Sequence, residues 1–246
     1  MLTDEELGRY ERQMKIDGFG VAGQEKLKKA KVVVVGAGGL GTPAATYLAA
    51  AGIGTLRIVD NDRVDLSNLN RQILHWTKDV KSNKVDSASR KLRQLNDTIQ
   101  VEPVMETLTE TNALDLISGF DVVVDGTDNL ETRLAVNKAI VQKKIPFVHG
   151  AVYGFQGRAT TIVPYETACI RCLYRGVLPQ SKPAVLGVTP GLIGLVEATE
   201  TVKLILGMGT LLKDRLLVYD GLKMTFATLK IRRNPTCEDC GGAPAD

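Results

Sequence analysis

The sequence predicts an α/β fold, a Rossmann-like doubly wound sheet whose parallel N-terminal half is continued by antiparallel strands. Short β-branched runs alternate with helical patterns up to residue 150, and this alternation predicts right-handed crossovers and a parallel sheet. The first run ends in a glycine loop, Gly36-Ala37-Gly38-Gly39-Leu40-Gly41. After Gly150 the pattern changes, and residues 158–163 and 216–231 have the character of antiparallel strands.

Each element follows from a local pattern. Thr3 and Glu6 form a capping box that predicts a first helix, within an N-terminal helical segment over residues 1–30. Apolar β-branched runs predict strands at residues 31–35, 55–59, 99–104, 121–124 and 145–148. Helical spacing predicts helices from the glycine loop to residue 51 and at residues 82–95, 109–117, 129–142 and 192–206. Residues 173–189 contain Pro and Gly without periodicity, and a loop of this length indicates a functional segment.

Composition limits the class of protein. The chain has 246 residues, of which 44% are hydrophobic, which is enough for a sizeable core. We expect a single domain over residues 1–246, in which halves at 31–150 and 151–246 follow the N-terminal segment. The net charge of +3 gives no case for a nucleic-acid partner. No apolar stretch could span a bilayer and no signal peptide opens the chain, so we expect a cytoplasmic protein without a membrane partner.

All four cysteines occur in two Cys-x-x-Cys pairs, Cys169 with Cys172 and Cys237 with Cys240. Two such turns can complete a tetrahedral shell of four thiolates, and a closed shell of this kind holds a structural zinc ion. Disulfides are an alternative that a reducing compartment disfavours. A thioredoxin-like redox pair is another alternative, but it does not explain two pairs. If all four cysteines bind metal, no thiol remains to act as a nucleophile.

The glycine loop predicts a nucleotide site. Gly36 permits a tight turn, Gly38 lets a phosphate approach the backbone, and Gly41 allows close packing of helix on strand. The following helix offers amide donors and the positive end of its dipole to a phosphate. Asp60 closes the next strand, where a carboxylate can hold ribose hydroxyls. The motif does not specify the nucleotide, and the alternative is tight strand–helix packing without a ligand.

Charged residues farther along the chain favour a triphosphate. Arg71 and Lys84 can neutralise phosphate charge during group transfer, and Asp128 can hold magnesium. Ligands of open α/β sheets bind at the carboxyl ends of strands, so Asp60, Arg71 and Asp128 are expected to converge there. Each residue also has an ordinary explanation. Arg71 or Lys84 alone suits a solvated surface, and Asp128 alone suits a helix N-cap.

Taken together, these residues resemble the ubiquitin-activating-enzyme-like superfamily, in its ThiF/MoeB/HesA adenylyltransferase branch. The motifs that carry the resemblance span nearly the whole chain: Arg9 to Gln13, the glycine loop, Asp60-Asn61-Asp62, Asn68 to Gln72, Lys84, Asp125 to Asn129 and both cysteine pairs. The resemblance implies MgATP and a small ubiquitin-like sulfur-carrier protein that ends in Gly-Gly. The carrier carboxylate would become an acyl-adenylate with release of pyrophosphate, for sulfur transfer in thiamine, molybdenum-cofactor or tRNA thiolation pathways.

The resemblance also implies roles for individual residues. It implies that the nucleotide and its magnesium ion are held by Gly36, Gly38, Gly39, Gly41, Asp60, Asp62, Asn68, Arg71, Lys84 and Asp128. Among these, Arg71, Lys84 and Asp128 are the expected catalytic residues. Arg12 resembles a catalytic arginine that reaches the ATP of a neighbouring subunit, which implies a homodimer. The four cysteines match structural zinc ligands, and residues 173–189 in the partner-binding half match a crossover loop that receives the carrier's tail.

One departure from the family pattern concerns thiol chemistry. Several relatives carry a further cysteine in the crossover loop, where it can form a persulfide or a thioester. Residues 173–184 contain no cysteine. We therefore expect adenylation without a thioester step, with sulfur or an amine arriving from another protein or a small molecule.

Three alternatives to this function stay open. An NAD- or FAD-dependent oxidoreductase would explain the glycine loop and Asp60, but not Arg71, Lys84 and Asp128 together. A second alternative is a non-catalytic half of a heterodimeric activating enzyme, and a third is an enzyme that activates a small-molecule or tRNA carboxylate. The two histidines, His75 and His149, are expected to be structural rather than catalytic.

Overall fold

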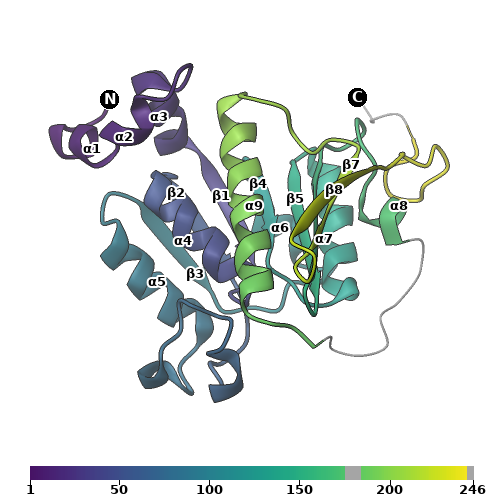
Figure 1. Ribbon diagram of the computed structural model, residues 1–246, viewed down its shortest axis with the longest axis horizontal. Helices are drawn as coiled ribbons and strands as arrows, with labels where there is room; N and C mark the ends of the chain where they lie inside the picture. Colours follow the sequence, from purple (N-terminus) through teal and green to yellow (C-terminus); the bar gives the residue numbers. More distant parts are fainter. Residues whose placement is uncertain (175–183, 243–246) are drawn as a thin grey trace.

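One mixed sheet of eight strands forms the centre of the computed structural model, which describes residues 1–174 and 184–242 (Figure 1). The strand order is β3-β2-β1-β4-β5-β6-β7-β8. The first five strands in this order are parallel, and the pairs from β5 to β8 are antiparallel, which confirms the expected fold class. The strands are β1 (Lys31–Val35), β2 (Thr55–Val59), β3 (Gln100–Val104), β4 (Val122–Asp125), β5 (Phe147–Tyr153), β6 (Gln156–Ile162), β7 (Arg215–Asp220) and β8 (Thr225–Lys230).

Helices cover both faces of this sheet and form the N-terminal segment (Figure 1). The segment contains three short helices, and the first begins at the expected capping box, where the Thr3 hydroxyl accepts from the Glu6 amide at 3.2 Å. The α-helices are α1 (Asp4–Arg9), α2 (Glu11–Met14), α3 (Gly20–Lys29), α4 (Gly41–Ala51), α5 (Lys84–Leu95), α6 (Ala113–Ile117), α7 (Leu130–Lys143), α8 (Ile170–Tyr174) and α9 (Val188–Leu206). Two short 3₁₀ helices, η1 (Leu66–Asn68) and η2 (Thr77–Asp79), lie between β2 and α5.

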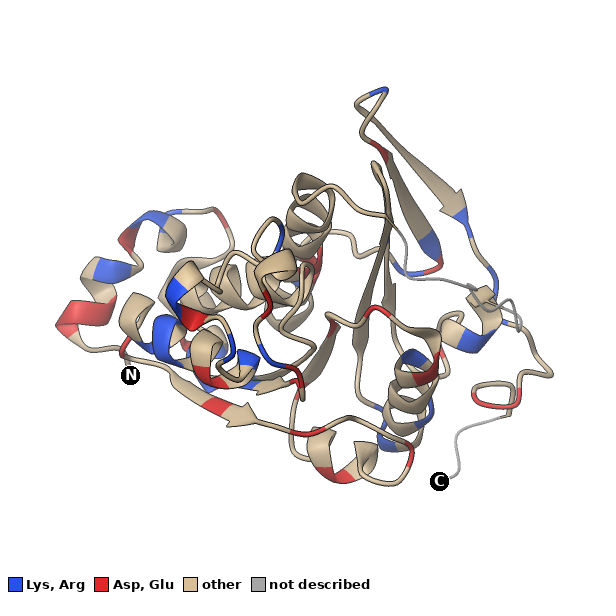
Figure 2. Ribbon diagram, turned by 90° about the horizontal axis from the view of Figure 1, so that it is seen from below, with Lys and Arg blue, Asp and Glu red and all other residues tan. Residues whose placement is uncertain are grey.

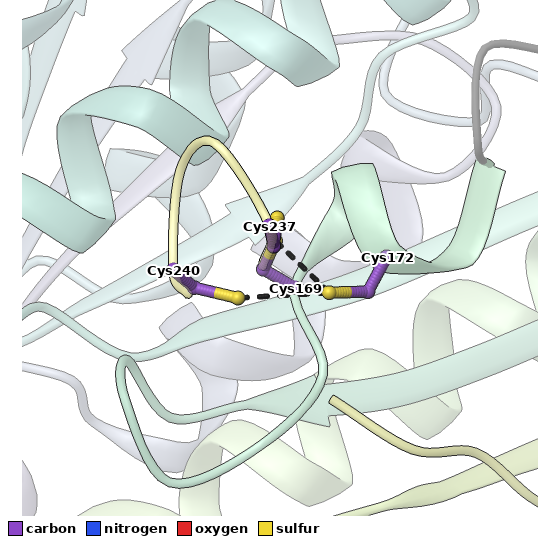
Figure 3. A group of neighbouring side chains, drawn as sticks. All are labelled: Cys169, Cys172, Cys237 and Cys240. Carbon is purple, nitrogen blue, oxygen red and sulfur yellow. Dashed lines mark hydrogen bonds between the residues drawn. The ribbon is translucent and has the colours of Figure 1, made fainter. Parts of the chain in front are cut away.

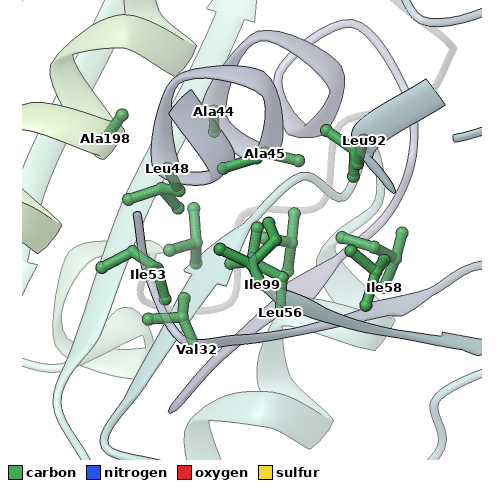
Figure 4. Packing of buried hydrophobic residues seen from close by; sticks show 14 of the residues in the cluster. Val32, Ala44, Ala45, Leu48, Ile53, Leu56, Ile58, Leu92, Ile99 and Ala198 are labelled. Atoms are coloured by element: carbon green, nitrogen blue, oxygen red, sulfur yellow. The ribbon is translucent and has the colours of Figure 1, made fainter. Parts of the chain in front are cut away.

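The alternation of β1 side chains builds a core on each face of the sheet. Val32 and Val34 pack into a cluster with side chains of α4, α5 and α9, part of which is drawn in Figure 4. Val33 and Val35 pack into a second cluster with α6, α7 and α8. All four valines are buried, and full burial of each stabilises the fold by about 1.5–3 kcal/mol. This two-sided burial explains why the strand is a continuous apolar run.

The strand order reverses between β1 and β4, which makes a topological switch point at the carboxyl ends of these strands. The glycine loop follows β1, and residues 126–129 follow β4, so both lie at this switch point. Helix α9 crosses the same face as α4 and begins near the carboxyl ends of these strands (Figure 1). The fold therefore directs three loop regions toward one end of the sheet.

Several boundaries differ from the sequence-based expectation. Helix α9 begins at Val188 rather than at residue 192, because Pro190 lies in the first turn, where the missing N–H of proline costs no hydrogen bond. Residues 216–231 form two strands joined by a turn, and α8 was not predicted. The predicted crossover segment at residues 173–189 includes the first turn of α9, and its residues 175–183 lie outside the described part of the chain.

The described residues show neither a segregation of charge along the chain in Figure 2 nor a helix that could span a membrane. Lys and Arg are interspersed with Asp and Glu along much of the chain in the view of Figure 2, in keeping with the small net charge. Within residues 1–174 and 184–242, no helix is both long and apolar enough to cross a membrane.

Candidate functional site

Backbone of three segments meets at the glycine loop without room for side chains. Gly36 has a φ of +99°, and its amide donates to the Val59 carbonyl at 2.7 Å. The Gly126 amide donates to the Val35 carbonyl at 2.7 Å. A Cβ atom at Gly36 would overlap the Gly126 carbonyl, and a Cβ at Gly41 would overlap the Gly36 carbonyl. Gly36 and Gly126 therefore permit the close approach of the ends of β1 and β4, and Gly41 permits the close packing of helix on strand that the motif predicts.

Asp60 braces this loop from the end of β2. Its Oδ2 accepts from the Ala37 amide at 2.7 Å, and its Oδ1 accepts from the Asp62 amide at 2.8 Å. A carboxylate has about four lone-pair sites, so these two bonds leave acceptor capacity for ribose hydroxyls. The carboxylate thus links two loops and can still receive a ligand.

Lys84 is buried, although a lysine alone in this pattern suits the surface. It opens α5, its side chain is 6% exposed, and its Nζ lies 2.7 Å from Asp62 Oδ2. A cation at a helix N-terminus opposes the helix dipole, so burial of Lys84 there requires a nearby anion. Asp62 supplies part of this charge, and its own carboxylate is 63% exposed. The ammonium is therefore available at a place where a further anion would be stabilised.

Asn68 ends η1 and Arg71 lies in the turn that follows it, and both are half-buried. The Arg71 guanidinium donates to the Ser67 carbonyl at 2.8 Å and to Asn70 Oδ1 at 3.0 Å. Its stem lies against the glycine loop, because a Cβ at Gly39 would be 3.6 Å from Arg71 Cγ. The structure thus brings this turn to the loop, as expected.

Asp128 lies in the turn between β4 and α7 and is exposed. Its ordinary explanation as a helix cap is wrong, because Asn129 is the N-cap of α7 and accepts from the Thr132 amide at 2.8 Å. A carboxylate at the carboxyl end of β4 that is not used as a cap can serve as a hard oxygen ligand.

A buried ion pair holds the turn that carries Asp128. Asp125 Oδ1 accepts from the Thr127 amide at 3.0 Å and from the Thr127 hydroxyl at 2.6 Å. Arg133 of α7 lies 2.9 Å from Asp125 Oδ2 and also donates to the Thr127 carbonyl at 2.7 Å. Burial raises the pKa of Asp125, but Arg133 and the hydrogen bonds outweigh it and hold the pKa at about 2. The turn is therefore fixed by a charge-assisted clamp that sequence patterns did not reveal.

His149 extends this clamp to α8. Its Nδ1 lies 2.5 Å from Asp125 Oδ2, and its Nε2 lies 3.0 Å from the Tyr174 hydroxyl. Burial lowers the pKa of His149, so the imidazole is neutral. Because ionised Asp125 can only accept, the proton is on Nδ1 and Tyr174 donates to Nε2. His149 is buried and hydrogen-bonded on both nitrogens, which fits the expected structural role.

Glu197 of α9 is the least compensated acid near this clamp. It is fully buried opposite Gly150, and neither carboxylate oxygen has a hydrogen-bond partner among the described residues. Burial and the nearby Asp125 raise the pKa of Glu197 well above its ordinary value, with Arg133 acting in the opposite direction. Burial therefore favours the protonated form of Glu197, and no sequence motif pointed to it.

Within one chain, Arg12 lies far from the other residues expected at the nucleotide site. It is exposed on α2, whose neighbour Gln13 donates to the Ala51 carbonyl at the C-terminal end of α4. The glycine loop lies at the other end of α4, and an eleven-residue helix is about 16 Å long. Arg12 forms no hydrogen bond or ion pair with the described residues.

The four cysteines gather into one buried cluster, drawn in Figure 3. Their sulfur atoms all lie within 4.8 Å of one another, and three of the separations are 3.9, 3.7 and 3.6 Å. Four thiolates about 2.3 Å from one ion would lie about 3.8 Å apart at the corners of a tetrahedron. The cluster can therefore hold a metal ion, and it is not a pair of disulfides.

Polar contacts hold the two cysteine turns together beside α7. Buried Asn137 accepts from the Ile170 amide at 2.8 Å and donates to Asp239 at 2.6 Å, so one side chain bonds both turns. The Asn234 amide donates to Cys172 Sγ at 3.3 Å. Such outer contacts orient the sulfur atoms before any ion binds.

The raised pKa of Glu197 generates a prediction about stability. In the unfolded chain Glu197 loses its proton above about pH 4.5, whereas in the folded protein it keeps the proton to higher pH. The free energy of unfolding of the wild type therefore falls as pH rises from the unfolded pKa toward the folded pKa. Replacement by glutamine removes this loss. The stability of Glu197→Gln relative to wild type should therefore increase from pH 5 to pH 8, by up to about 1.4 kcal/mol per pH unit. Urea denaturation at both pH values measures it, and a relative stability that falls with pH would contradict the assignment.

Comparison with known proteins agrees with the geometry. The ThiF family model matches residues 10–239. The chain is 46% identical over 247 residues to the SAMP-activating enzyme E1 of Haloferax volcanii, covering 98% of this chain and 91% of that protein. It is 44% identical over 253 residues to the sulfur carrier protein adenylyltransferase of Thermus thermophilus, covering 98% and 93%.

A solved structure supports the same relationship. The crystal structure of E. coli MccB with ATP superposes with a TM-score of 0.84 at 26% sequence identity, over 95% of this chain and 74% of that one. The matches to the family, to whole relatives and to this structure extend over almost all of the chain. The chain therefore belongs to the ThiF family and is an adenylyltransferase.

Proposed function

We propose that this protein activates the C-terminal carboxylate of a small ubiquitin-like sulfur-carrier protein that ends in Gly-Gly. The observation that carries the proposal is the meeting of the glycine loop, buried Lys84, Arg71 and exposed Asp128 at one switch point. The relatives named for sulfur-carrier and SAMP activation are 44% and 46% identical over nearly this whole chain. The product would serve sulfur transfer in thiamine, molybdenum-cofactor or tRNA thiolation pathways.

ATP would bind as a substrate over the glycine loop of the half at residues 31–150. The backbone of this loop is open to the phosphates because it carries Gly36, Gly38, Gly39 and Gly41. Asp60 and Asp62 follow the end of β2, where Asp60 would hold the ribose. Asn68, Arg71 and Lys84 would contact the phosphates. Lys84 suits this task because its buried ammonium has only one carboxylate partner among the described residues.

The chemistry needs no protein nucleophile. An oxygen of the carrier's carboxylate attacks the α-phosphorus of ATP, the bond from that phosphorus to the bridging oxygen breaks, and pyrophosphate leaves with the electron pair. The products are the carrier acyl-adenylate and pyrophosphate. Positively charged Arg71 and Lys84 stabilise the negative charge that develops on the phosphates, and the loop geometry positions the reactants.

Asp128 would hold magnesium. Magnesium in such sites is bound through one or two carboxylates and the substrate phosphates, and it neutralises phosphate charge. Asp128 fits because its carboxylate is exposed at the carboxyl end of β4, while the Asp125 and Arg133 clamp fixes its turn.

We propose that activation by this chain ends at the acyl-adenylate, and that sulfur or an amine then arrives from another protein or a small molecule. All four cysteines are buried in the cluster, and residues 173–184 contain none. The metal in the cluster is proposed to be zinc, because a closed tetrahedral set of four thiolates suits structural zinc. The zinc ion would join the turn at residues 169–172 to the turn at residues 237–240. Both turns belong to the half at residues 151–246, and we propose that this half binds the carrier.

Arg12 is proposed to act in a second subunit. Within one chain, α2 packs at the end of α4 that is remote from the glycine loop. An arginine there can serve a nucleotide only in another copy, so the proposal requires a homodimer with composite sites. This arrangement makes Arg12 a catalytic residue in trans.

Substitution of Asp128 tests the active site. Asp128→Ala should lower carrier-dependent ATP–pyrophosphate exchange by roughly hundredfold or more, because phosphate charge would be poorly neutralised. Asp115→Ala on α6, which also removes an exposed carboxylate, should retain wild-type exchange. Wild-type exchange in Asp128→Ala would refute its role, and exchange that depends on a small carboxylate rather than a Gly-Gly protein would refute the proposed substrate.

Mixing two inactive variants tests the composite site. Arg12→Ala and Asp128→Ala homodimers should each be nearly inactive, whereas a mixed dimer has one site with both native residues. After random exchange of subunits, about one quarter of the sites, and of the wild-type activity, should return. Failure to recover activity, with mixed dimers shown by mass spectrometry, would mean that Arg12 does not act in trans.

Metal analysis tests the cysteine cluster. Protein purified under reducing conditions should contain about one zinc ion per chain, since four thiolates complete one shell. Cys240→Ser should lose most of this zinc and unfold at a lower temperature, because the C-terminal turn would be released. Bound iron, or a disulfide between these cysteines under the same conditions, would contradict the assignment.

A further inference from the structure

A buried hydrogen-bonded relay ends on the glycine loop, and the adenylation chemistry does not account for it. His75 is 3% exposed and lies between the turn at residues 68–72 and α5. Its Nε2 is 2.9 Å from the Ala37 carbonyl oxygen, and its Nδ1 is 3.0 Å from Ser87 Oγ. Lys91 Nζ is 2.9 Å from the same Ser87 oxygen. The relay therefore joins α5 to the second residue of the loop.

The donors and acceptors of this relay permit one arrangement of protons. The Ala37 carbonyl can only accept, so His75 must carry its proton on Nε2. The pKa of His75 is lowered by burial and by the nearby charges of Lys91 and Lys84, so the ring is neutral and Nδ1 is an acceptor. Ser87 then donates to Nδ1, and its oxygen accepts from Lys91. Lys91 is itself held by Asp79 and by the Leu74 carbonyl.

Both peptide groups of Ala37 are consequently held. Its N–H donates to Asp60 at 2.7 Å, and its carbonyl accepts from His75. In a trans peptide the carbonyl and the next N–H point in opposite directions. With the Ala37 carbonyl drawn toward buried His75, the Gly38 N–H is turned away from the interior. That N–H has no acceptor among the described residues, and glycine-loop amides of this kind bind phosphate.

We propose that His75 is a positioning residue for the nucleotide, and that its Nε2–H holds the Ala37 carbonyl so that the Gly38 amide faces the phosphates. The proposal rests on ATP binding at this loop, as in the proposed function. His75 does not touch the nucleotide or any reacting atom. It acts by preventing rotation of the peptide between Ala37 and Gly38, which would otherwise point a carbonyl at a phosphate.

Two amide variants separate this role from a merely structural one. Glutamine at position 75 can place its Nε2 donor near the position of the histidine Nε2, whereas asparagine reaches toward Ser87 but not toward Ala37. His75→Gln should bind ATP within about threefold of wild type, and His75→Asn should bind about tenfold more weakly, the loss of about one hydrogen bond. The KM for the carrier protein should be unchanged in both variants.

Calorimetric titration of ATP into each variant, with denaturation midpoints measured in parallel, decides between the two roles. Equal weakening in both variants, or weakening that follows the loss of stability, would mean that His75 only fills the core. Unchanged affinity in His75→Asn would also overturn the proposal. If the wild-type protein itself fails to bind ATP, the nucleotide site is wrong and the positioning role falls with it.

The proton positions provide a test that is independent of nucleotide. The chain has two histidines, and the structure assigns the proton to Nε2 in His75 and to Nδ1 in His149. Nitrogen NMR of ¹⁵N-histidine-labelled protein should show one ring of each tautomer, and the Nε2–H ring should be missing from His75→Gln. A His75 ring protonated on Nδ1 could not donate to Ala37 and would overturn the proposal even if ATP binds.

Discussion

The close approach of backbone at the switch point is the constraint on which the candidate site depends. Gly36, Gly41 and Gly126 meet with so little space that a Cβ on any of them would overlap a carbonyl. This contact holds the end of β1, the start of α4 and the end of β4 against one another. Because the loops after β1, β2 and β4 begin at this edge of the sheet, charges that are distant in sequence reach one place. A side chain at any of these glycines would push the loops apart.

Buried polar groups then fix the direction of each loop. Asp60 and His75 hold the glycine loop, while Asp125, Arg133 and His149 hold the turn before Asp128. An unsatisfied buried group costs about 1–3 kcal/mol, so these contacts stabilise one arrangement only when all members are paired. Glu197 is the exception, and protonation limits its cost. The loops of the candidate site are thus oriented by charge and hydrogen bonding, on a framework held by apolar packing.

The sequence was informative where a single local pattern determines the structure. The runs at β1 and β4 are apolar on both faces, and the glycine spacing requires a strand–helix turn, so both were predictable. Convergence of Asp60 and Arg71 near the loop followed from the rule that ligands bind at strand ends. The true start of α9 at Val188 was missed because Pro190 lies in its first turn. Proline is also common in loops, so the sequence there is typical of either structure.

Other features depend on contacts between distant segments and leave no local pattern. Lys84 was expected to contact phosphates, but its burial and its ion pair with Asp62, 22 positions earlier, were not predicted. The Asp125, His149 and Tyr174 contacts join β4, β5 and α8, and α8 itself was not predicted. Glu197 is buried only because α9 crosses Gly150. Sequence periodicity identifies which residues are inside, but not which polar groups meet there.

The buried cysteine cluster and the proposed adenylation chemistry together predict which product forms. With the four thiols buried together, the carrier should be activated without becoming attached to this chain. Intact-mass spectrometry of the protein incubated with MgATP and a Gly-Gly carrier measures this directly. The account predicts a carrier whose mass increases by one adenylyl group, and an enzyme of unchanged mass. A thiol-labile conjugate between the two proteins, or a carrier without an adenylyl group, would contradict it.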